Sequence, residues 1–361
     1  MHYKFTVIRD IYYCRYCHLS FNLIDEHLDF FDTHNVTKGM AEEIAYSAQG
    51  CLSFEKGSEN IKRYLNVDVS ESSTRTISEK IGKIVYDKDL ENSKRTYEKP
   101  EESIPTLHEK DKKKGILYNY ADGSMVNTVE KDKNGSTWRE IKLGLVYYDR
   151  NSISRKDGKK IITQKEYVTH LGSVDVFKKF MIDASVKEGY GQIQKTVFLG
   201  DGAPWIWNMC DELYPDAVQI LDHSHLKENV YGFSKYLHPN NEQKMTIWAE
   251  KIMEKLDKGN TDEVIDELPV MEDKKMPSGV VNLREYISKN KNRIKYPEFI
   301  EKGYLIGSGA VESGHKGVLQ QRLKQPGMRW GKQGAQYIAT LRAKKASGKW
   351  DTIKDYIAVA S

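Results

Sequence analysis

Cysteine is scarce in this sequence, with four residues in 361, and two of them, Cys51 and Cys210, stand alone. So few cysteines do not make the disulfide framework of a small secreted domain. Long apolar runs are also missing: no stretch of 18 or more apolar residues is present, and the first residues lack the apolar core of a secretory signal. These absences predict a protein of the reducing cytoplasm without a membrane partner.

Acidic residues are missing from one long segment. Between Ser313 and Trp350 there is no Asp or Glu, and Glu312 is the single carboxylate of residues 302–349. The segment carries many cations, among them Lys316, Arg322, Lys324, Arg329, Lys332, Arg342, Lys344, Lys345 and Lys349. The whole chain is nearly balanced at +4, so only the distribution of charge favours a polyanionic partner. A lone acid beside a basic strip suits a metal ligand that works on phosphates.

The hydrophobic pattern divides the chain into five parts. Residues 1–30 alternate like short strands around a Cys-x-x-Cys pair, residues 37–87 are helical, and residues 88–114 have the charge and proline content of a linker. Residues 115–225 and 302–350 alternate strands with helices, which predicts an α/β mixed sheet flanked by helices. Residues 226–301 interrupt this pattern with an all-helical insertion.

Two helices are expected in the N-terminal helical part, over residues 54–65 and 72–84. They resemble a helix-turn-helix, which would place Arg75 on the second helix against DNA. A plain helical hairpin explains the same pattern.

Three acids stand where an α/β sheet usually builds its site. Asp122 ends a strand and precedes Gly, Asp201 lies between two glycines after a short apolar strand, and Glu312 lies on a helix that follows Gly307-Ser308-Gly309. Strand ends and helix starts face the crevice at the edge of such a sheet. Three carboxylates meeting there could hold two Mg²⁺ ions about 3.5–4 Å apart. Each acid taken alone is explained equally well as a turn residue or a helix cap.

Two long blocks carry a resemblance to a known family. Residues 200–228 (GDGAPWIWNMCDELYPDAVQILDHSHLKE) and 305–330 (LIGSGAVESGHKGVLQQRLKQPGMRW) closely resemble the ISKra-type family of bacterial insertion-sequence transposases. The stretches 121–128, 138–147 and 167–177 match the same family in the same order, so the resemblance spans roughly residues 5–350.

The resemblance implies a DDE transposase with an RNase H-like catalytic core and a helical insertion before the last acid. It makes Asp122, Asp201 and Glu312 the catalytic triad and the ligands of Mg²⁺ or Mn²⁺. The implied activity is metal-dependent cleavage at insertion-sequence ends followed by strand transfer into target DNA. The implied partners are both DNAs and further copies of the chain in a synaptic complex associated with the nucleoid.

Several residues are further candidates for DNA contact. His225 belongs to an Asp-x-x-His pattern and would touch DNA or orient the centre, unless it is only part of a polar helix start. Trp205 would stack on unpaired bases or pack in the core. Arg322, Lys324 and Arg329 are expected on the phosphate backbone. His315 and Lys316 follow Glu312 on the same helical face, where they would contact phosphate or simply be solvated.

Cys14 and Cys17 look like half of a zinc knuckle, which needs four ligands. His2 and His18 are poor substitutes for a second cysteine pair. Either the chain begins late relative to its relatives or the knuckle is degenerate, and zinc binding is left open.

Two other functions fit the same residues. A truncated or domesticated relative would bind DNA without cutting it, and a general RNase H-like nuclease would cut nucleic acid without preferring element ends.

Overall fold

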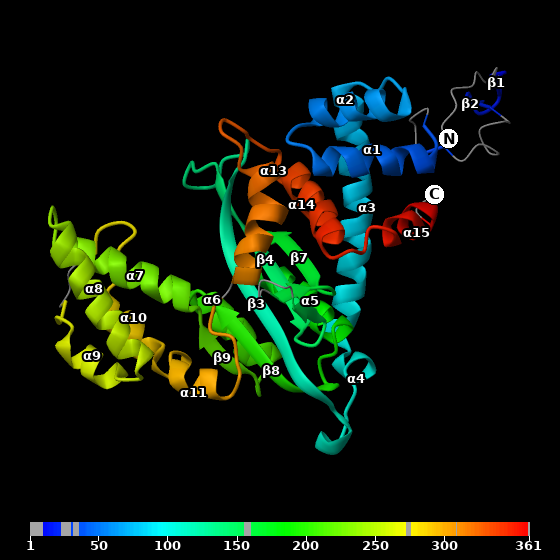
Figure 1. Cartoon of the computed structure of the whole chain (residues 1–361). Coiled ribbons are helices and arrows are strands. Elements are labelled where there is room, and N and C mark those ends of the chain that lie inside the picture. The colour runs from blue at the N-terminus through cyan, green and yellow to red at the C-terminus, as the bar shows by residue number, and fades with distance from the viewer. Residues whose placement is uncertain are drawn as a thin grey trace.

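The computed structural model describes residues 10–22, 30–31, 36–154, 160–271, 276–307 and 309–359. In Figure 1 a long central sheet separates two helical ends. One end combines the first helices with the last ones, and the other holds helices α7 to α11. Among the described helices none is both long and apolar enough to cross a membrane.

The central sheet has five strands in the order β7-β4-β3-β8-β9. Strands β7, β4 and β3 are antiparallel neighbours, whereas β3, β8 and β9 run parallel. The strands are β3 (Lys113–Asn127), β4 (Trp138–Tyr148), β7 (Glu166–Leu171), β8 (Ile193–Gly200) and β9 (Val218–Leu221). The fold is therefore a mixed α/β sheet, as the alternation of strands and helices predicted.

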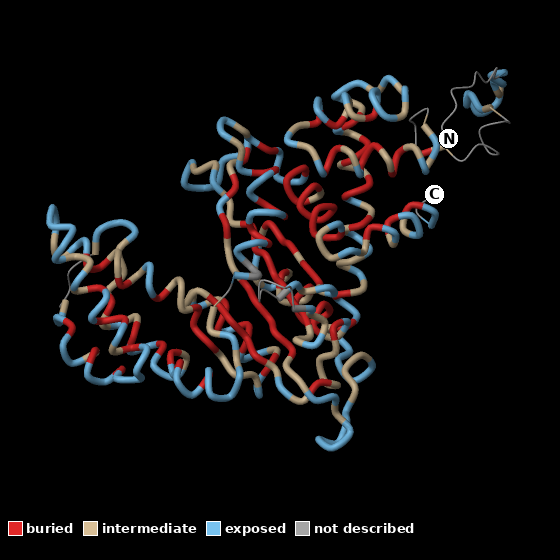
Figure 2. The backbone as a smooth tube through the Cα atoms, in the orientation of Figure 1, coloured by how far each residue is buried: buried red, intermediate tan, exposed pale blue. Residues whose placement is uncertain are grey.

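The sheet strands are buried almost continuously along their centres, as Figure 2 shows. Residues 117–121 of β3 and 141–147 of β4 are all buried, because helices cover the sheet and leave no alternating solvent face. The helices that contact it are α5 (Val174–Lys187), α6 (Pro204–Leu213), α12 (Gly309–Gly314) and α14 (Lys332–Ala346). A small hairpin, β5 (Ser152–Ser154) and β6 (Lys160–Ile162), lies beside the sheet as a separate pair.

The first part of the chain forms a cysteine-bearing hairpin and three packed helices. The hairpin pairs β1 (Tyr12–Tyr13) with β2 (Ser20–Phe21). The helices are α1 (Lys38–Gly50), α2 (Phe54–Leu65) and α3 (Glu71–Glu98). Each begins at a side-chain cap, from Thr37, Ser53 and Ser70 respectively, which satisfies an otherwise free amide of the first turn.

Helix α3 is much longer than the sequence pattern indicated. The linker assignment for residues 88–114 was wrong over 88–98, which continue this helix. Ser93 and Thr96 are buried there and donate to Asp183 of α5, at 3.5 and 2.7 Å. Most charged residues of this stretch lie on the solvent face of a packed helix, so their density resembles that of a linker. Only α4 (Pro100–Ser103) and the short η1 turn (Glu109–Asp111) interrupt the remaining connection.

Helices α3 and α14 cross at a glycine. A Cβ atom on Gly82 would lie 2.7 Å from both the Cβ and the carbonyl oxygen of Tyr337. We expect Gly82→Ala to reduce the free energy of unfolding by about 1–3 kcal/mol, because backbone must move to admit the methyl group. Gly232, in the middle of α7 with no atom near its would-be Cβ, is the control: Gly232→Ala should raise stability by about 0.5–1 kcal/mol. Urea unfolding of both variants checks this, and equal effects would contradict the close crossing.

The described residues from 223 to 301 contain helices and no strand. They are α7 (His223–Leu237), α8 (Glu242–Asp257), α9 (Thr261–Glu267), α10 (Leu283–Lys289), the 3₁₀ turn η2 (Lys291–Arg293) and α11 (Tyr296–Glu301). Tyr296 donates to the carbonyl of Leu221 at 3.1 Å, and Arg293 donates to Gln219 at 2.7 Å. These bonds anchor the segment to the edge strand β9.

The chain returns to the sheet through three short turns and ends in two helices. They are α12, the π-helical turn η3 (His315–Gln320) and α13 (Gln321–Leu323), then α14 and α15 (Thr352–Val359). Helix α14 packs on β7 and on α3. Gln336 fixes that contact by accepting from the amide of Leu171 and donating to the carbonyl of Thr169.

Candidate active site

Two aspartates lie side by side where two parallel strands end their pairing. Strand β3 pairs with β8 up to Ala121 opposite Gly200, so the next residues are Asp122 and Asp201. Asp201 follows the end of β8, but β3 continues to Asn127 in its pairing with β4, so the prediction that Asp122 ends a strand was wrong. Both side chains are half-buried. Gly202 has φ +100°, a left-handed conformation that glycine adopts without strain. That turn lets the amide of Ala203 donate back to Asp201 at 2.8 Å.

The two carboxylates respond differently to their surroundings. Burial raises the pKa of Asp201, and the neighbouring charge of Asp122 adds to this, against smaller opposing effects of the Ala203 amide and His225. Burial would also raise the pKa of Asp122, but His315, His225 and the Gly123 amide outweigh it and hold the pKa below its ordinary value. Two adjacent acids of which one is destabilised by the other form a place where a cation is favourable.

His315 contacts the carboxylate of Asp122. Its Nε2 lies 2.9 Å from the Oδ2 of Asp122, and the imidazole is only 5% exposed. It opens the π-helical turn η3, a rare backbone form that concentrates at functional sites. The sequence left His315 between a phosphate contact and a solvated side chain, whereas the structure buries it against an acid.

Glu312 is placed near this pair but does not join it. Its helix α12 contacts β3 and β4, yet the Glu312 side chain is exposed. Across the described part of the chain no group of three or more His, Cys, Asp or Glu side chains is placed to hold a metal ion. The structure therefore brings together two of the three predicted acids. Their oxygens are the donors that Mg²⁺ prefers, and a third protein ligand is not yet gathered with them.

The start of α7 lies beside the same two acids. Asp222 caps this helix, accepting from the amides of Ser224 at 2.7 Å and His225 at 3.1 Å. This cap sets the first turn, from which half-buried His225 acts electrostatically on both Asp122 and Asp201.

Asp222 was not singled out from the sequence. It follows Leu221, which pairs with Gly200, so it extends the row formed by Asp122 and Asp201 to the neighbouring strand β9. It is 1% exposed, and its Oδ2 has no hydrogen-bond partner among the described residues. The Asp-x-x-His spacing could have identified it, because Asp222 caps the helix turn that carries His225.

Arg322 does not lie where a phosphate could reach it, so its assignment to the DNA backbone was wrong. The side chain is 1% exposed, and its guanidinium lies 4.5 Å from the ring centre of Phe54 and 4.7 Å from that of Trp330. It donates to the carbonyl of Leu52 at 3.1 Å. Burial lowers the pKa of Arg322 to about 10.

Other cations of the acid-free strip are also used inside the protein. Lys344 pairs with Asp89 at 2.9 Å, and Lys349 pairs with Glu166 and with Glu188. Arg342 donates to three backbone carbonyls, those of Gln49, Gly317 and Val318. The strip lacks acids in sequence only, since other segments supply them in space.

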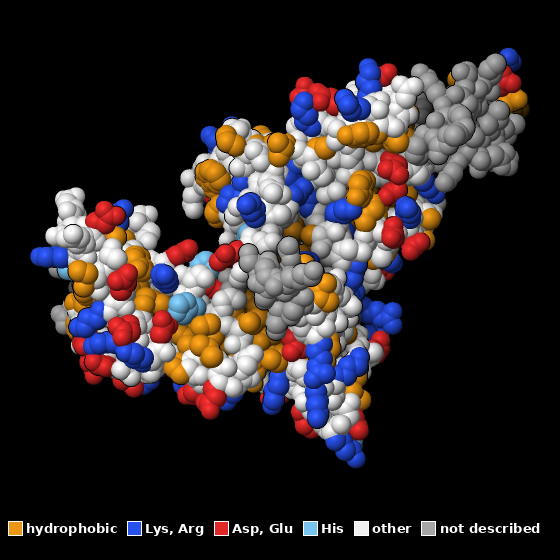
Figure 3. Space-filling view, in the orientation of Figure 1, with side chains coloured by type: hydrophobic (Ala, Val, Ile, Leu, Met, Phe, Trp, Pro, Cys, Tyr) orange, Lys and Arg blue, Asp and Glu red, His pale blue; other side chains and the backbone are white. Residues whose placement is uncertain are grey.

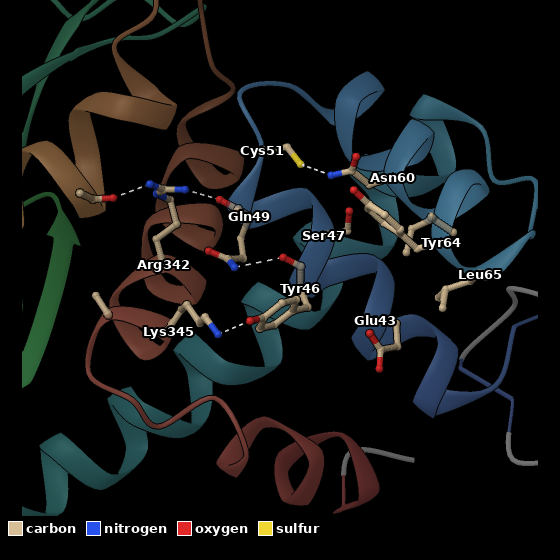
Figure 4. Close-up of a pocket in the computed structure, with 14 residues that line it drawn as sticks. Glu43, Tyr46, Ser47, Gln49, Cys51, Asn60, Tyr64, Leu65, Arg342 and Lys345 are labelled. Carbon is tan, nitrogen blue, oxygen red and sulfur yellow. Dashed lines mark hydrogen bonds between the residues drawn. The ribbon is translucent and has the colours of Figure 1, made fainter. Parts of the chain in front are cut away.

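Arg342 also lines a cavity of about 580 Å³ between α1, α2 and α14, away from the two aspartates. In Figure 4 Arg342 reaches toward Gln49 and Lys345 toward Tyr46. Cys51 and Asn60 face each other on its other side, with the amide donating to sulfur at 3.1 Å. The described residues that line this cavity include no pair of acids comparable to Asp122 and Asp201.

The remaining predicted DNA contacts are exposed or partly exposed. Lys316, Lys324, Arg329 and Arg75 are exposed. Lys324 lies close to Asp122, because its Nζ is 3.1 Å from the Oγ of Ser124, two residues beyond Asp122 on the same face of β3. In Figure 3 the hollow between the central sheet and the helical segment that contains α7 to α11 is bordered by basic, acidic and histidine side chains.

Trp205 is half-buried, as core packing requires. Its ring meets that of Phe177 edge-on at 5.9 Å, and the Nζ of Lys142 lies 5.3 Å from its centre. These contacts account for the side chain, and base stacking by Trp205 stays a prediction.

The β1–β2 hairpin carries the two cysteines of the predicted zinc knuckle. Cys14 and Cys17 are free thiols, and His18 is held by Tyr13, with Oη and Nδ1 2.7 Å apart. His2 lies outside the described residues. Zinc binding by this pair stays a prediction.

The fold and site define a mixed α/β protein with two acids adjacent across the parallel strands β3 and β8. Residues 3–354 match the model of an uncharacterised protein family, UPF0236, and the chain belongs to that family. No curated protein matches the sequence. Among solved structures the chain is similar to the Drosophila P element transposase strand transfer complex, with 9% identity and a TM-score of 0.37. That similarity covers 90% of this chain and 97% of the other, and at this TM-score it does not establish a shared fold.

Proposed function

We propose that the protein is a DDE transposase of the ISKra type, which cuts insertion-sequence ends and transfers the freed strand into target DNA. The observation that carries this proposal is the pair Asp122 and Asp201, which directly follow the last paired residues of the parallel strands β3 and β8, with the helix of Glu312 packed against β3 and β4. The strand order, three antiparallel strands followed by two parallel ones, supports an RNase H-like core. The motif blocks around the three acids supply the link to the family.

In this proposal Asp122, Asp201 and Glu312 hold Mg²⁺ or Mn²⁺. When bound, the metal lowers the pKa of a water molecule or hydroxyl and stabilises the leaving oxygen of a phosphodiester. Glu312 precedes His315 by three residues, about one helical turn, and His315 already touches Asp122. In this proposal a movement of α12 would bring the exposed Glu312 to the two aspartates as the third carboxylate.

The neighbouring residues have separate tasks in the reaction. Asp222 holds the first turn of α7, so that His225 faces the acids where the scissile phosphate would lie. Lys324, beside Ser124, contributes a positive charge to the phosphates on the same face of β3. Joining two element ends in one reaction requires more than one copy, so we propose a homo-oligomer on DNA.

The direct test is cleavage of DNA from the borders of the gene's own locus by the purified full chain with Mg²⁺. Nicks at the borders, followed by joining of the free 3′-hydroxyl to a target plasmid, are the expected result. A scrambled border of equal length and composition is the matched control. Equal cutting of both DNAs would identify a general RNase H-like nuclease instead.

A second candidate is a DNA-binding relative that has lost catalysis. The exposed position of Glu312 and the missing three-ligand cluster among described residues favour it. It predicts salt-sensitive DNA binding with no Mg²⁺- or Mn²⁺-dependent nick under any condition. Any nick that depends on the paired aspartates excludes it.

Lys324 provides a test of where DNA lies. We expect Lys324→Ala to weaken binding of border DNA and to reduce the slope of log K against log salt by about 1, because one phosphate contact is lost. Fluorescence anisotropy across a salt series without divalent cations measures this. Lys258→Ala, an exposed lysine at the end of α8, is the control, and an equal effect there would show that the loss is not local to the site.

A further inference from the structure

A cavity beside Asp201 is not used by the chemistry above, and it is separate from the cavity between α1, α2 and α14. It has a volume of about 410 Å³ and lies between α6 and the α10–η2 segment. Gly202, the residue directly after Asp201, forms part of its wall. A group bound there would contact Gly202, the residue next to Asp201.

The wall next to Asp201 is held in place. The Oη of Tyr286 donates to the carbonyl of Asp201 at 2.8 Å. A Cβ atom on Gly202 would lie 2.8 Å from that ring, and the residue has a positive φ, so glycine is required here. Tyr286 thus joins the cavity to the strand end that carries the acid.

The inner wall is aromatic and cationic. The guanidinium of Arg293 lies 4.5 Å from the ring centre of Trp207, and Gln219 holds its Nε at 2.7 Å. Trp207 is 5% exposed, yet its Nε1 has no hydrogen-bond partner among the described residues. A buried indole N–H without a partner lacks the hydrogen bond that such groups normally make.

Two acids lie at the rim. Glu285 pairs with Lys289 at 3.1 Å, whereas Asp211 accepts a hydrogen bond from the neutral amide of Gln219 at 2.5 Å. The side chain of Asn208 is exposed at the mouth of the cavity. An amide, planar aromatic and guanidinium surfaces, and a volume of a few hundred cubic ångströms suit a flat heterocycle with polar edges.

We propose that this cavity receives one unstacked nucleobase of the bound DNA, from a nucleotide close to the scissile phosphate. The inference rests on the proposed function, because it needs DNA at the two aspartates. Extruding a base from the duplex costs stacking and pairing energy, which contacts in a fitted cavity offset. Held in the cavity, the base would set the register of the phosphate on Asp122 and Asp201.

The experiment fills the cavity and removes the base separately. Asn208→Trp places a bulky ring at the mouth, while Ser288→Trp adds the same ring to an exposed position of α10 that does not line the cavity. Binding of border DNA is measured by anisotropy without divalent cations, using intact DNA and DNA with a single abasic nucleotide at each position around the nick. Thermal unfolding confirms that both variants are folded.

We expect Asn208→Trp to weaken binding of intact DNA on the order of tenfold, the equivalent of about 1.4 kcal/mol. At one abasic position the loss should shrink to less than twofold, because no base remains to be placed. Ser288→Trp should bind every DNA like the unmodified chain. If Asn208→Trp weakens all DNAs equally, or none, the nucleobase cavity is refuted while border binding and the transposase proposal stand. If the unmodified chain does not distinguish border from scrambled DNA, the proposed function fails first.

Discussion

Asp201→Asn is expected to abolish border cleavage while leaving the protein folded. Asparagine keeps the size of the side chain and can still accept from the Ala203 amide, but it loses the charge that a divalent cation needs. Loss of about 4 kcal/mol of transition-state stabilisation corresponds to a rate reduction of about a thousandfold. The nicking assay on border DNA, with Mg²⁺ and with Mn²⁺, measures this.

The same substitution should not weaken the fold, and this separates a lost site from a lost structure. Burial and the charge of Asp122 raise the pKa of Asp201, so the ionised carboxylate opposes folding at neutral pH. In metal-free buffer Asp201→Asn should therefore unfold at the same or a higher temperature than the unmodified chain. Any gain should disappear as the pH falls through the raised pKa, because the original side chain then becomes neutral. Cleavage that persists in this variant would remove Asp201 from the reaction.

Arg322→Ala is expected to destabilise the protein by about 2–4 kcal/mol. The truncation empties the space between Phe54 and Trp330 and leaves the carbonyl of Leu52 without its donor. Arg322→Met should recover most of the loss, because it refills the space and removes a buried charge whose Nε and Nη2 lack partners among the described residues. Urea unfolding of the two variants gives both numbers.

Arg329→Ala is the matched comparison, since Arg329 is exposed and lies one residue before Trp330. Its stability should change by less than about 0.5 kcal/mol, whereas its DNA affinity should fall in a salt-dependent way. Arg322→Met should show the reverse, with DNA affinity preserved. A large loss of DNA affinity in a stable Arg322→Met protein would contradict the buried role that the structure assigns.

Local pattern was enough to find two strands of the sheet and the aspartates that follow their apolar runs. The apolar run before Gly200-Asp201-Gly202 is strand β8, and the run before Asp122 is the buried centre of β3. Both were visible because β-branched and aromatic residues between turn signals specify strands without reference to the rest of the chain.

Charged stretches of the sequence were assigned wrongly where their residues have partners far away along the chain. Residues 88–98 appear to be a linker, yet Ser93 and Thr96 pack against Asp183, about 90 positions along the chain. Lys344 seems free in the acid-free strip, yet its acid is Asp89.

By itself the sequence determined the alternation of strands and helices, the helical segment after β9, and the placing of Asp122 and Asp201 directly after apolar strand segments, because these depend on neighbours along the chain. The tertiary structure alone decided that Arg322 is interior, that His315 rather than Glu312 contacts Asp122, and that Asp222 extends the row of acids. Those outcomes follow from strand pairing and helix packing between residues far apart in sequence. A pattern read along one chain carries no information about which of its charged side chains will find a partner in space.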